Sequence, residues 1–323
     1  MLSKLNFGYQ QPNHTFADGP ESTYKWLERV AVDAEHTGFD SFWIMDHLTQ
    51  IPIVTNPSEP ILEPYVTLSA IASKTSRIKL GALVTSNTFR NPALLAKMAA
   101  TLDVISNGRL FFGIGAGWYE AEHIQYNIPF YTTGERIRRL EEAIQIVKKV
   151  WMEDRATFKG RYYEINELIC NPKPVQKPHP PILVGGGGEK MTLKVVAKHA
   201  DACNLGAPLD VVQHKLRILK GHCEAVGRDY NTIRKTKLGR VIIDRTEEGA
   251  SIKLEKMQQH RASGISLEQY KKESIFGSPR QCIEQIQKLA DAGIDYLIIN
   301  IAGQYDPANI ELFSKEVMPA FKR

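Results

Sequence analysis

The chain has 323 residues, of which 43% are hydrophobic and 24% are charged, and its net charge is +5. These proportions are typical of a soluble globular protein with a substantial core. Runs of five or six basic residues are absent from the sequence, which gives little support to nucleic-acid binding. No apolar run approaches a membrane span, and the N-terminus lacks the hydrophobic region of a signal peptide.

The cysteines are scattered and form no Cys-x-x-Cys pair; they are Cys170, Cys203, Cys223 and Cys282. No His-x-x-x-His pair accompanies them, so the sequence predicts neither a disulfide framework nor a metal site. We therefore expect reduced thiols and a cytoplasmic protein that binds no nucleic acid and no membrane.

Short apolar runs alternate with amphipathic segments along the whole chain. The predicted strands are Leu5–Tyr9, Ser41–Met45, Ile78–Val84, Arg109–Ile114, Pro181–Val184, Ala202–Leu205, Leu238–Ile243 and Tyr296–Ile301. The predicted helices are Ser22–Thr37, Tyr65–Lys74, Pro92–Ser106, Glu135–Glu153, Glu189–His199, Val211–Val226 and Pro279–Ala292. Eight strands alternating with helices over this length favour a closed parallel barrel over an open sheet. No stretch has the composition of a linker, so we predict one α/β domain, a (β/α)8 TIM barrel over residues 1–323.

Two segments, at about residues 156–180 and 247–274, interrupt this alternation. The first contains a strand-turn-strand pattern around Lys159 and Gly160, followed by a proline-rich approach to the fifth strand. The second is polar and rich in lysine, with weak periodicity. Long insertions between barrel elements are usually lids or surface loops, which is what we expect for both.

The strand Arg109–Ile114 runs into alternating glycines, Gly113, Gly115 and Gly117, and then Trp118. Glycines at alternate positions let the backbone approach a ligand that a Cβ atom would repel. The dinucleotide-binding signature is excluded, because it requires glycine at the position of Trp118 and a later acidic residue. In a parallel barrel such a strand end forms one lip of a ligand pocket. A bulge eased by glycine is the structural alternative.

Four consecutive glycines, Gly185–Gly188, follow the fifth predicted strand and precede a helix with Lys190 in its first turn. Bare N–H groups at a helix N-terminus beside a cation make a site for a phosphate. The alternative is a flexible turn, but four glycines carry an entropy cost that a simple turn does not require. The pattern therefore favours a phosphate site.

Polar side chains follow other strands as well. Asp46 and His47 form a possible acid/base pair, although adjacent residues face one pocket only if the strand has already ended. A purely structural pair is the alternative. Glu120, Glu122 and His123 have no second cluster to complete a metal site, so we expect the start of a solvated helix there.

Together these segments resemble the luciferase-like monooxygenase superfamily, and within it the oxidoreductases that use the deazaflavin F420. The segments that carry the resemblance are Gly38–Trp43 with Asp46–His47, Ser76–Gly81, Arg90–Lys97, Thr101–Leu110, the alternating glycines Gly113, Gly115 and Gly117, Gly134–Arg136 and Pro180–Lys190. The resemblance runs nearly end to end. It implies a TIM barrel with insertions, a homodimer, a small-molecule substrate and F420 across the C-terminal mouth of the barrel.

The resemblance also implies roles for single residues. Asp46 would contact the deazaflavin ring, and a cis peptide between Leu83 and Val84 would support it. The other expected cofactor contacts are Ser86, Ala116 and Gly117 on the ribityl side, and Gly187, Gly188, Lys190 and Met191 on the phosphate arm. The candidate catalytic residues are His47, as a proton carrier, and Trp118, beside the substrate.

One departure and two alternatives limit this interpretation. The F420-dependent sugar-phosphate dehydrogenases carry a glutamate after the glycine that matches Gly117, whereas this chain has Trp118, which argues against the same chemistry on sugar phosphates. The first alternative is a monooxygenase of the same superfamily that uses FMN and activates oxygen. The second is a non-catalytic cofactor-binding protein, against which the intact polar set at five strand ends argues. The substrate stays undetermined, because variable loops build the pocket walls.

Overall fold

The computed structural model describes residues 4–16, 18–206, 208–258 and 266–322. Their contacts define two compact units: unit 1 comprises Met1–Leu62, Leu205–Leu216 and Arg234–Arg323, and unit 2 comprises Glu63–Asn204 and Arg217–Ile233. Within the described ranges, no helix is both long enough and apolar enough to cross a membrane. The expected single domain over residues 1–323 stays a prediction.

Unit 1 is built on parallel strands in the order β2-β1-β12-β10-β11. These strands are β1 (Asn6–Gln10), β2 (Ser41–Ile44), β10 (Arg234–Ile243), β11 (Ser274–Gly277) and β12 (Tyr296–Ile301). Its helices are η1 (Pro20–Ser22), α1 (Thr23–His36), α8 (Glu247–Gln258), α9 (Leu267–Lys272), α10 (Pro279–Asp291), α11 (Pro307–Glu316) and η3 (Met318–Ala320). Strands such as β2 are buried at every position, as expected for strands of a parallel sheet.

Aromatic rings join the first strand of unit 1 to its C-terminal helices. The ring of Phe7 lies 5.8 Å from that of Phe313 and 5.9 Å from that of Phe321, both edge to face. On the same strand, Tyr9 meets Phe39 at 5.5 Å. Edge-to-face pairs of this kind add about 0.5–1.5 kcal/mol each beyond area burial, so they fix β1 against α11.

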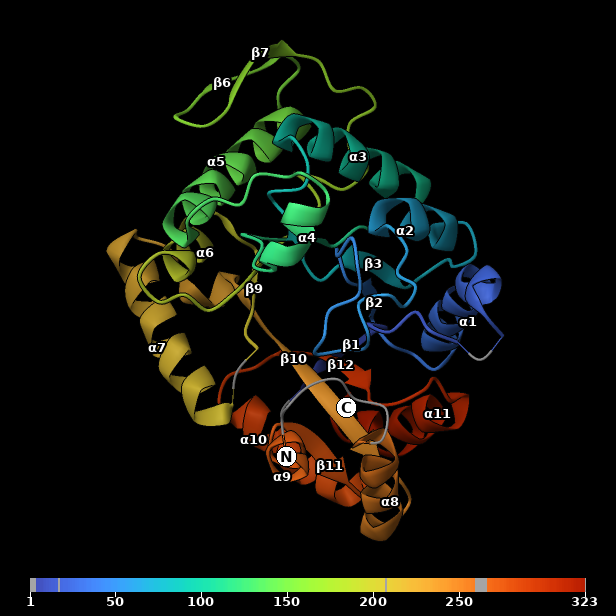
Figure 1. The fold of residues 1–323 in the computed structure, drawn as a ribbon. Coiled ribbons are helices and arrows are strands. Elements are labelled where there is room, and N and C mark those ends of the chain that lie inside the picture. The colour runs from blue at the N-terminus through green and yellow to red at the C-terminus, as the bar shows by residue number, and fades with distance from the viewer. Residues whose placement is uncertain (1–3, 17, 207, 259–265, 323) are drawn as a thin grey trace. The chain divides into compact units, whose positions relative to one another are not determined.

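Unit 2 contains the parallel strands β4 (Thr85–Ser86), β5 (Phe112–Gly115), β8 (Ile182–Gly185) and β9 (Ala202–Asn204), paired in that order. The strand β3 (Lys79–Ala82) joins them through a bridge between Leu80 and Leu110. The helices are α2 (Pro64–Ala72), α3 (Pro92–Ile105), α4 (Glu120–Gln125), α5 (Thr133–Met152), α6 (Thr192–His199) and η2 (Tyr230–Thr232), and α7 (Leu209–Ala225) is divided between the units. Within unit 2, α2, α3 and α5 pack side by side in sequence order (Figure 1).

The eight predicted strands and seven predicted helices all occur, most of them with shifted ends. β12 matches its prediction, Tyr296–Ile301, whereas β10 begins at Arg234, before the predicted Leu238. The fourth predicted strand begins only at Phe112. The side chain of Arg109, which was predicted to start this strand, instead donates to the carbonyl oxygens of Ala72, Thr75, Ile78 and Ser106.

The expectation of a lid or surface loop at residues 247–274 is wrong for the part of this segment that the structure describes. This segment forms α8 and α9 and leads into β11, which the sequence analysis missed; residues 259–265 lie outside the described residues. Among the residues of α8 whose side chains the structure describes, Ala250 and Leu254 alone join the buried cluster with Ile242, Tyr270 and Phe276. So few apolar positions leave a helical period too weak to recognise in the sequence.

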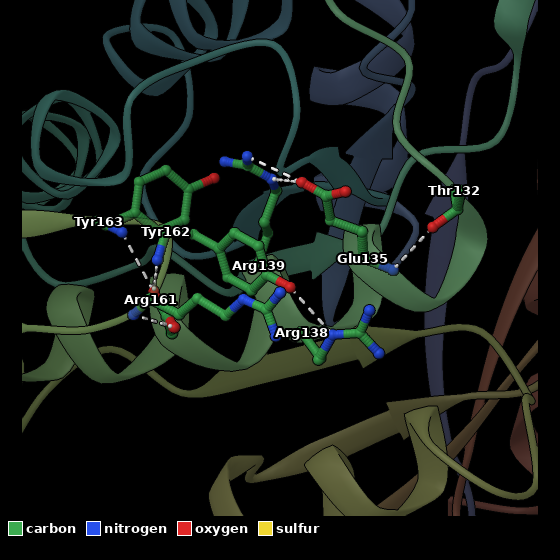
Figure 2. A network of polar contacts seen from close by, with 8 residues as sticks. Thr132, Glu135, Arg138, Arg139, Arg161, Tyr162 and Tyr163 are labelled. Carbon is green, nitrogen blue, oxygen red and sulfur yellow. Dashed lines mark hydrogen bonds and ion pairs between the residues drawn. The ribbon is translucent and has the colours of Figure 1, made fainter.

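The strand-turn-strand pattern of the first insertion is confirmed as an antiparallel hairpin of β6 (Ala156–Lys159) and β7 (Glu164–Leu168). Its turn is tied to α5, because the carboxylate of Glu142 accepts hydrogen bonds from the N–H groups of Arg161, Tyr162 and Tyr163 at 2.8, 2.9 and 3.2 Å (Figure 2). The hairpin is therefore a fixed attachment of unit 2.

Arginines of α5 complete this attachment. Figure 2 shows Arg139 paired with Glu135, at 2.9 Å, and Arg138 bonded to the hydroxyl of Tyr162, at 3.0 Å. The Arg139 guanidinium also lies 4.6 Å from the ring of Tyr162 and 5.6 Å from that of Tyr163. Stacking of a cation on aromatic faces contributes about 0.5–1 kcal/mol at exposed sites, so the hairpin has several independent anchors.

The side chain of Val84 occupies the space over three glycines on the neighbouring strands. A Cβ atom on Gly115 would lie 2.8 Å from Val84 Cγ2, and one on Gly185 would lie 2.7 Å from the same atom. On Gly113 it would lie 3.2 Å from Val84 Cγ1 and would strike the carbonyl of Ala82. Gly115 thus makes room for Val84, and Gly113 chiefly for the Ala82 carbonyl, so packing accounts for both glycines; that they admit a ligand stays a prediction. The cis peptide expected between Leu83 and Val84 is confirmed.

Gly185→Ala tests this packing, because the added methyl would lie 2.7 Å from Val84 Cγ2. We expect urea denaturation to show a loss of about 1–3 kcal/mol in unfolding free energy, as for other overpacked cores. Val84→Ala removes the opposing methyls, so the double variant should be less destabilised than the sum of the singles. Strict additivity would contradict the packing role. The control is Gly221→Ala in α7, where nothing lies within 4 Å and no loss is expected.

Candidate functional site

Three adjacent parallel strands of unit 2 end at the same edge, with Ser86 closing β4, Gly115 closing β5 and Gly185 closing β8. Carboxyl ends of parallel barrel strands are where ligands bind. The structure gathers most of the predicted site residues there, next to or just beyond these ends: Leu83, Val84, Ser86, Ala116, Gly117, Trp118, Gly187, Gly188, Lys190 and Met191. Asp46 and His47 belong to unit 1.

A series of linked hydrogen bonds runs from Ser86 through Thr88 and His123 to Tyr119. Ser86 Oγ lies 2.9 Å from Thr88 Oγ1, which lies 2.7 Å from His123 Nε2, and His123 Nδ1 lies 2.8 Å from the carbonyl oxygen of Tyr119. His123 and its neighbour Glu122 are buried, which corrects the expectation of a solvated helix start. Among the described residues, no cluster of side chains suited to a metal ion occurs.

Two separate observations show why position 117, next to these hydroxyl groups, requires glycine. Its φ of +72° is in the left-handed region, which only glycine enters readily. A Cβ atom there would lie 2.6 Å from Ser86 Oγ and 2.9 Å from Thr88 Oγ1. The third glycine of the alternating set is therefore required by the site itself, unlike the two that pack against Val84.

Arg136, at the start of α5, holds the loop after β5. Its Nε donates to the carbonyl of Gly117 at 3.3 Å, a second nitrogen donates to the carbonyl of Tyr131, and its guanidinium lies 4.1 Å from the ring of Phe130. Burial lowers the pKa of Arg136, and the charge of Glu120 opposes this shift. The sequence analysis used Arg136 only as part of the resemblance and missed this contact.

The four-glycine segment leaves a group of backbone donors open. Gly186 has φ +113° and donates to the carbonyl of Asn204 at 3.2 Å, whereas the N–H groups of Gly187, Gly188, Lys190 and Met191 donate to no described residue. The helix α6 begins only at Thr192, so the expectation that Lys190 lies in its first turn is wrong. Lys190 is instead an exposed cation in the turn beside the open donors, an arrangement that suits an anion.

Asn87, which the sequence analysis gave no role, carries a buried amide at the end of β4. Its backbone N–H donates to the carbonyl of Gly115 at 2.9 Å, and the residue is 1% exposed. Within the described ranges, neither Nδ2 nor Oδ1 has a hydrogen-bond partner. Buried amides are nearly always satisfied in native proteins, so Asn87 is suited to a polar ligand or water.

Trp118 is the exposed aromatic residue at this edge. It is 54% exposed, and its ring lies 5.4 Å from that of Tyr119 in a tilted arrangement. The exposed indole ring of Trp118 offers an apolar face that a ligand can contact. This is compatible with a place beside the substrate, which stays a prediction.

In unit 1, Asp46 and His47 lie beyond β2, which ends at Ile44. The alternation of a strand therefore does not force their side chains apart. Asp46 is 2% exposed and His47 is half-buried. Whether they act as an acid/base pair stays a prediction.

The family model for luciferase-like monooxygenases matches residues 5–274. The chain belongs to the luciferase-like monooxygenase family. It is 32% identical to a protein of Kineococcus radiotolerans named F420-dependent glucose-6-phosphate dehydrogenase, over 98% of this chain and 97% of that protein.

Solved structures with the same fold differ in their cofactors. An F420-dependent secondary alcohol dehydrogenase in complex with an F420-acetone adduct superimposes with TM-score 0.85 and 20% identity, over 99% of this chain and 100% of that one. The oxygenating constituent of 3,6-diketocamphane monooxygenase of Pseudomonas putida, in complex with FMN, superimposes with TM-score 0.77 and 22% identity, over 98% of each chain. These likenesses confirm the predicted fold class, a luciferase-like TIM barrel.

His14, after β1, gives a pH test. It is buried and its Nδ1 accepts a hydrogen bond from the N–H of Leu62 at 3.1 Å. Burial lowers its pKa from 6.5 to about 4, against a smaller opposing effect of the Gln11 backbone. A lowered histidine pKa means that the unfolded chain binds the proton more tightly.

We expect the unfolding free energy to fall by about 3 kcal/mol as the pH decreases from about 6.5 to about 4, and to level off below that. His14→Asn keeps an acceptor for Leu62 but cannot titrate, so this part of the pH dependence should disappear from denaturation curves. Equal slopes in the two proteins would contradict a buried neutral His14.

Proposed function

We propose that the protein is an F420-dependent oxidoreductase that transfers a hydride between C5 of the deazaflavin and a small-molecule substrate. The observation that carries the proposal is the group of open N–H donors at Gly187, Gly188, Lys190 and Met191. F420 has one phosphodiester and an acidic tail, and both suit this group and the Lys190 cation. The identity of 32% to a relative named for F420 supports the choice of cofactor.

The amide of Asn87 also fits a deazaflavin. The pyrimidinedione part of that ring carries carbonyl and N–H groups, and Asn87 offers a buried donor and a buried acceptor without partners among the described residues. A ligand that satisfies both would remove a penalty of about 1–3 kcal/mol for each unpaired group.

The remaining roles follow the resemblance. Residues of unit 2 would hold the cofactor: Leu83 and Val84 at the ring, Ser86, Ala116 and Gly117 at the ribityl side, and Gly187, Gly188, Lys190 and Met191 at the phosphate. For unit 1 we propose that Asp46 contacts the ring and that His47 exchanges a proton with the substrate. F420, when bound, supplies a hydride donor or acceptor. The side chains bind, orient and exclude water.

The substrate we propose is not a sugar phosphate. Trp118 stands where the resemblance gives the sugar-phosphate dehydrogenases a glutamate, and an exposed indole cannot exchange the proton that such a carboxylate does. We further propose that the protein is a cytoplasmic homodimer. Its four cysteines are buried and none of them forms a disulfide, which fits a reducing compartment.

Cofactor titration tests the function directly. We expect the purified protein to bind F420 at least about 10-fold more tightly than FMN, a difference of about 1.4 kcal/mol. The measurement is fluorescence titration of cofactor-free protein with each compound. Equal or tighter FMN binding, together with oxygen consumption, would assign the protein to the monooxygenases instead.

Variants of the phosphate segment test the placement. Gly187→Ala puts a methyl where the backbone would approach the phosphate, so F420 affinity should fall while unfolding stays cooperative. Lys190→Gln removes one charge-assisted contact and should weaken binding by about 1–2 kcal/mol. Lys194→Gln, on an exposed turn of α6, makes the same change in charge and should leave the affinity unchanged. Normal F420 binding by Gly187→Ala, or its failure to fold, would exclude this site for the phosphate.

A further inference from the structure

The four-glycine segment is held at both ends by backbone hydrogen bonds. Gly186 donates to the carbonyl of Asn204 at 3.2 Å. At the other end, Leu193 in α6 donates to the carbonyl of Gly188 at 3.0 Å. Glycines lose more conformational entropy on ordering than other residues do. Each contact that orders the segment in the cofactor-free protein therefore lowers the entropy that binding must remove.

A side chain of α7 bonds the turn that joins the glycines to α6. His222 Nε2 lies 2.8 Å from the carbonyl oxygen of Glu189. A carbonyl oxygen can only accept, so Nε2 carries hydrogen and donates it to Glu189. His222 is half-buried, and both residues belong to unit 2. α7 is therefore hydrogen-bonded directly to the turn between Gly188 and Lys190.

This hydrogen bond sets the direction of the next N–H group. The peptide bond between Glu189 and Lys190 is trans, so its carbonyl oxygen and its N–H point in opposite directions. Because the carbonyl is turned toward His222, the N–H of Lys190 points away from that side chain. This N–H is one of the four that donate to no described residue. His222 thus orients an open donor through the peptide group that begins at Glu189.

We propose that His222 is a positioning residue of the phosphate site: by holding the carbonyl of Glu189, it directs the N–H of Lys190 toward the phosphate of the bound cofactor. The inference rests on the proposed function, which places the phosphodiester of F420 at the four-glycine segment. The role requires a donor at the position of Nε2 and no charge on the ring.

The first test needs no F420. Protein labelled with ¹⁵N-lysine is titrated with inorganic phosphate at constant ionic strength, and comparison with Lys190→Arg identifies the amide signal of Lys190. We expect this signal to shift with phosphate, and His222→Phe to need about 3- to 10-fold more phosphate for the same shift, as for loss of one hydrogen bond.

Two outcomes of this titration would overturn the proposal: no shift of the Lys190 signal in the unmodified protein, or the same response in His222→Phe. The readout stands even if the protein does not bind F420, a result that would count against the proposed function alone. His222→Ala replaces the phenylalanine variant if that variant does not fold.

The second test compares F420 with the same deazaflavin carrying a free ribityl chain and no phosphate. We expect His222→Phe to raise the dissociation constant of F420 by about 3- to 10-fold and to leave that of the phosphate-free compound unchanged. A general loss of stability would weaken the binding of both compounds. Equal losses would therefore contradict the positioning role.

A variant that keeps the donor separates this role from simple packing. Glutamine places an N–H near the position of histidine Nε2, so His222→Gln should bind F420 within about twofold of the unmodified protein. A loss as large as that of His222→Phe would show that the donor is not what matters, and the proposal would fail.

The matched control is Arg228, which follows α7 and donates to the carbonyl of Ala197, near the C-terminal end of α6, at 3.3 Å. Arg228→Met also removes a side-chain bond to a backbone carbonyl, but one that lies beyond the turn. At physiological salt, which screens the removed charge, we expect an unchanged ratio of the two dissociation constants. A change in this ratio as large as that of His222→Phe would overturn the specific role of His222.

Discussion

The packing of Val84 against three glycines is the constraint on which the edge of unit 2 depends. A Cβ atom on Gly115 of β5 or on Gly185 of β8 would lie only 2.8 or 2.7 Å from Val84 Cγ2, so neither strand can carry a side chain there without a shift. Where a strand ends in glycine, no side chain covers the backbone, so another group can approach the backbone closely. The glycines that close β5 and β8 therefore share one packing partner, whereas Gly117, beyond β5, is required by Ser86 and Thr88.

The loop after β5 depends on buried polar groups that satisfy one another. Arg136 and His123 come from two different helices and bond the carbonyls of Gly117 and Tyr119. A buried network of this kind rigidifies a site when each group has its partner, and it is destabilising when one is missing. The site therefore has a rigid side built on side-chain hydrogen bonds, and an open side at the four-glycine segment.

Sequence patterns predicted the features that have a local cause. The apolar run Tyr296–Ile301 predicts a strand at its observed ends, and the four glycines predict a turn with bare N–H groups. The features that failed have causes elsewhere in the chain. His123 bonds to Thr88 and packs on Phe89, both far away in the sequence, and α8 escaped recognition because few of its described residues join the buried cluster. The packing of Gly113 and Gly115 was likewise hidden, because their neighbours Ala82 and Val84 belong to a distant part of the sequence, at the end of β3 and just beyond it.

Buried polar atoms without partners are concentrated where strands end. Within the described ranges they include Oγ1 of Thr49 and Oε1 of Gln50 after β2, and both amide atoms of Asn87 after β4; Thr23, at the start of α1, is the exception. Each such atom costs about 1–3 kcal/mol, which a chain selected for stability alone would remove. Departures of this kind from local rules are expected at functional sites. The carboxyl ends of the strands, where luciferase-like and other TIM barrels bind ligands, are therefore also where this chain gives up stability.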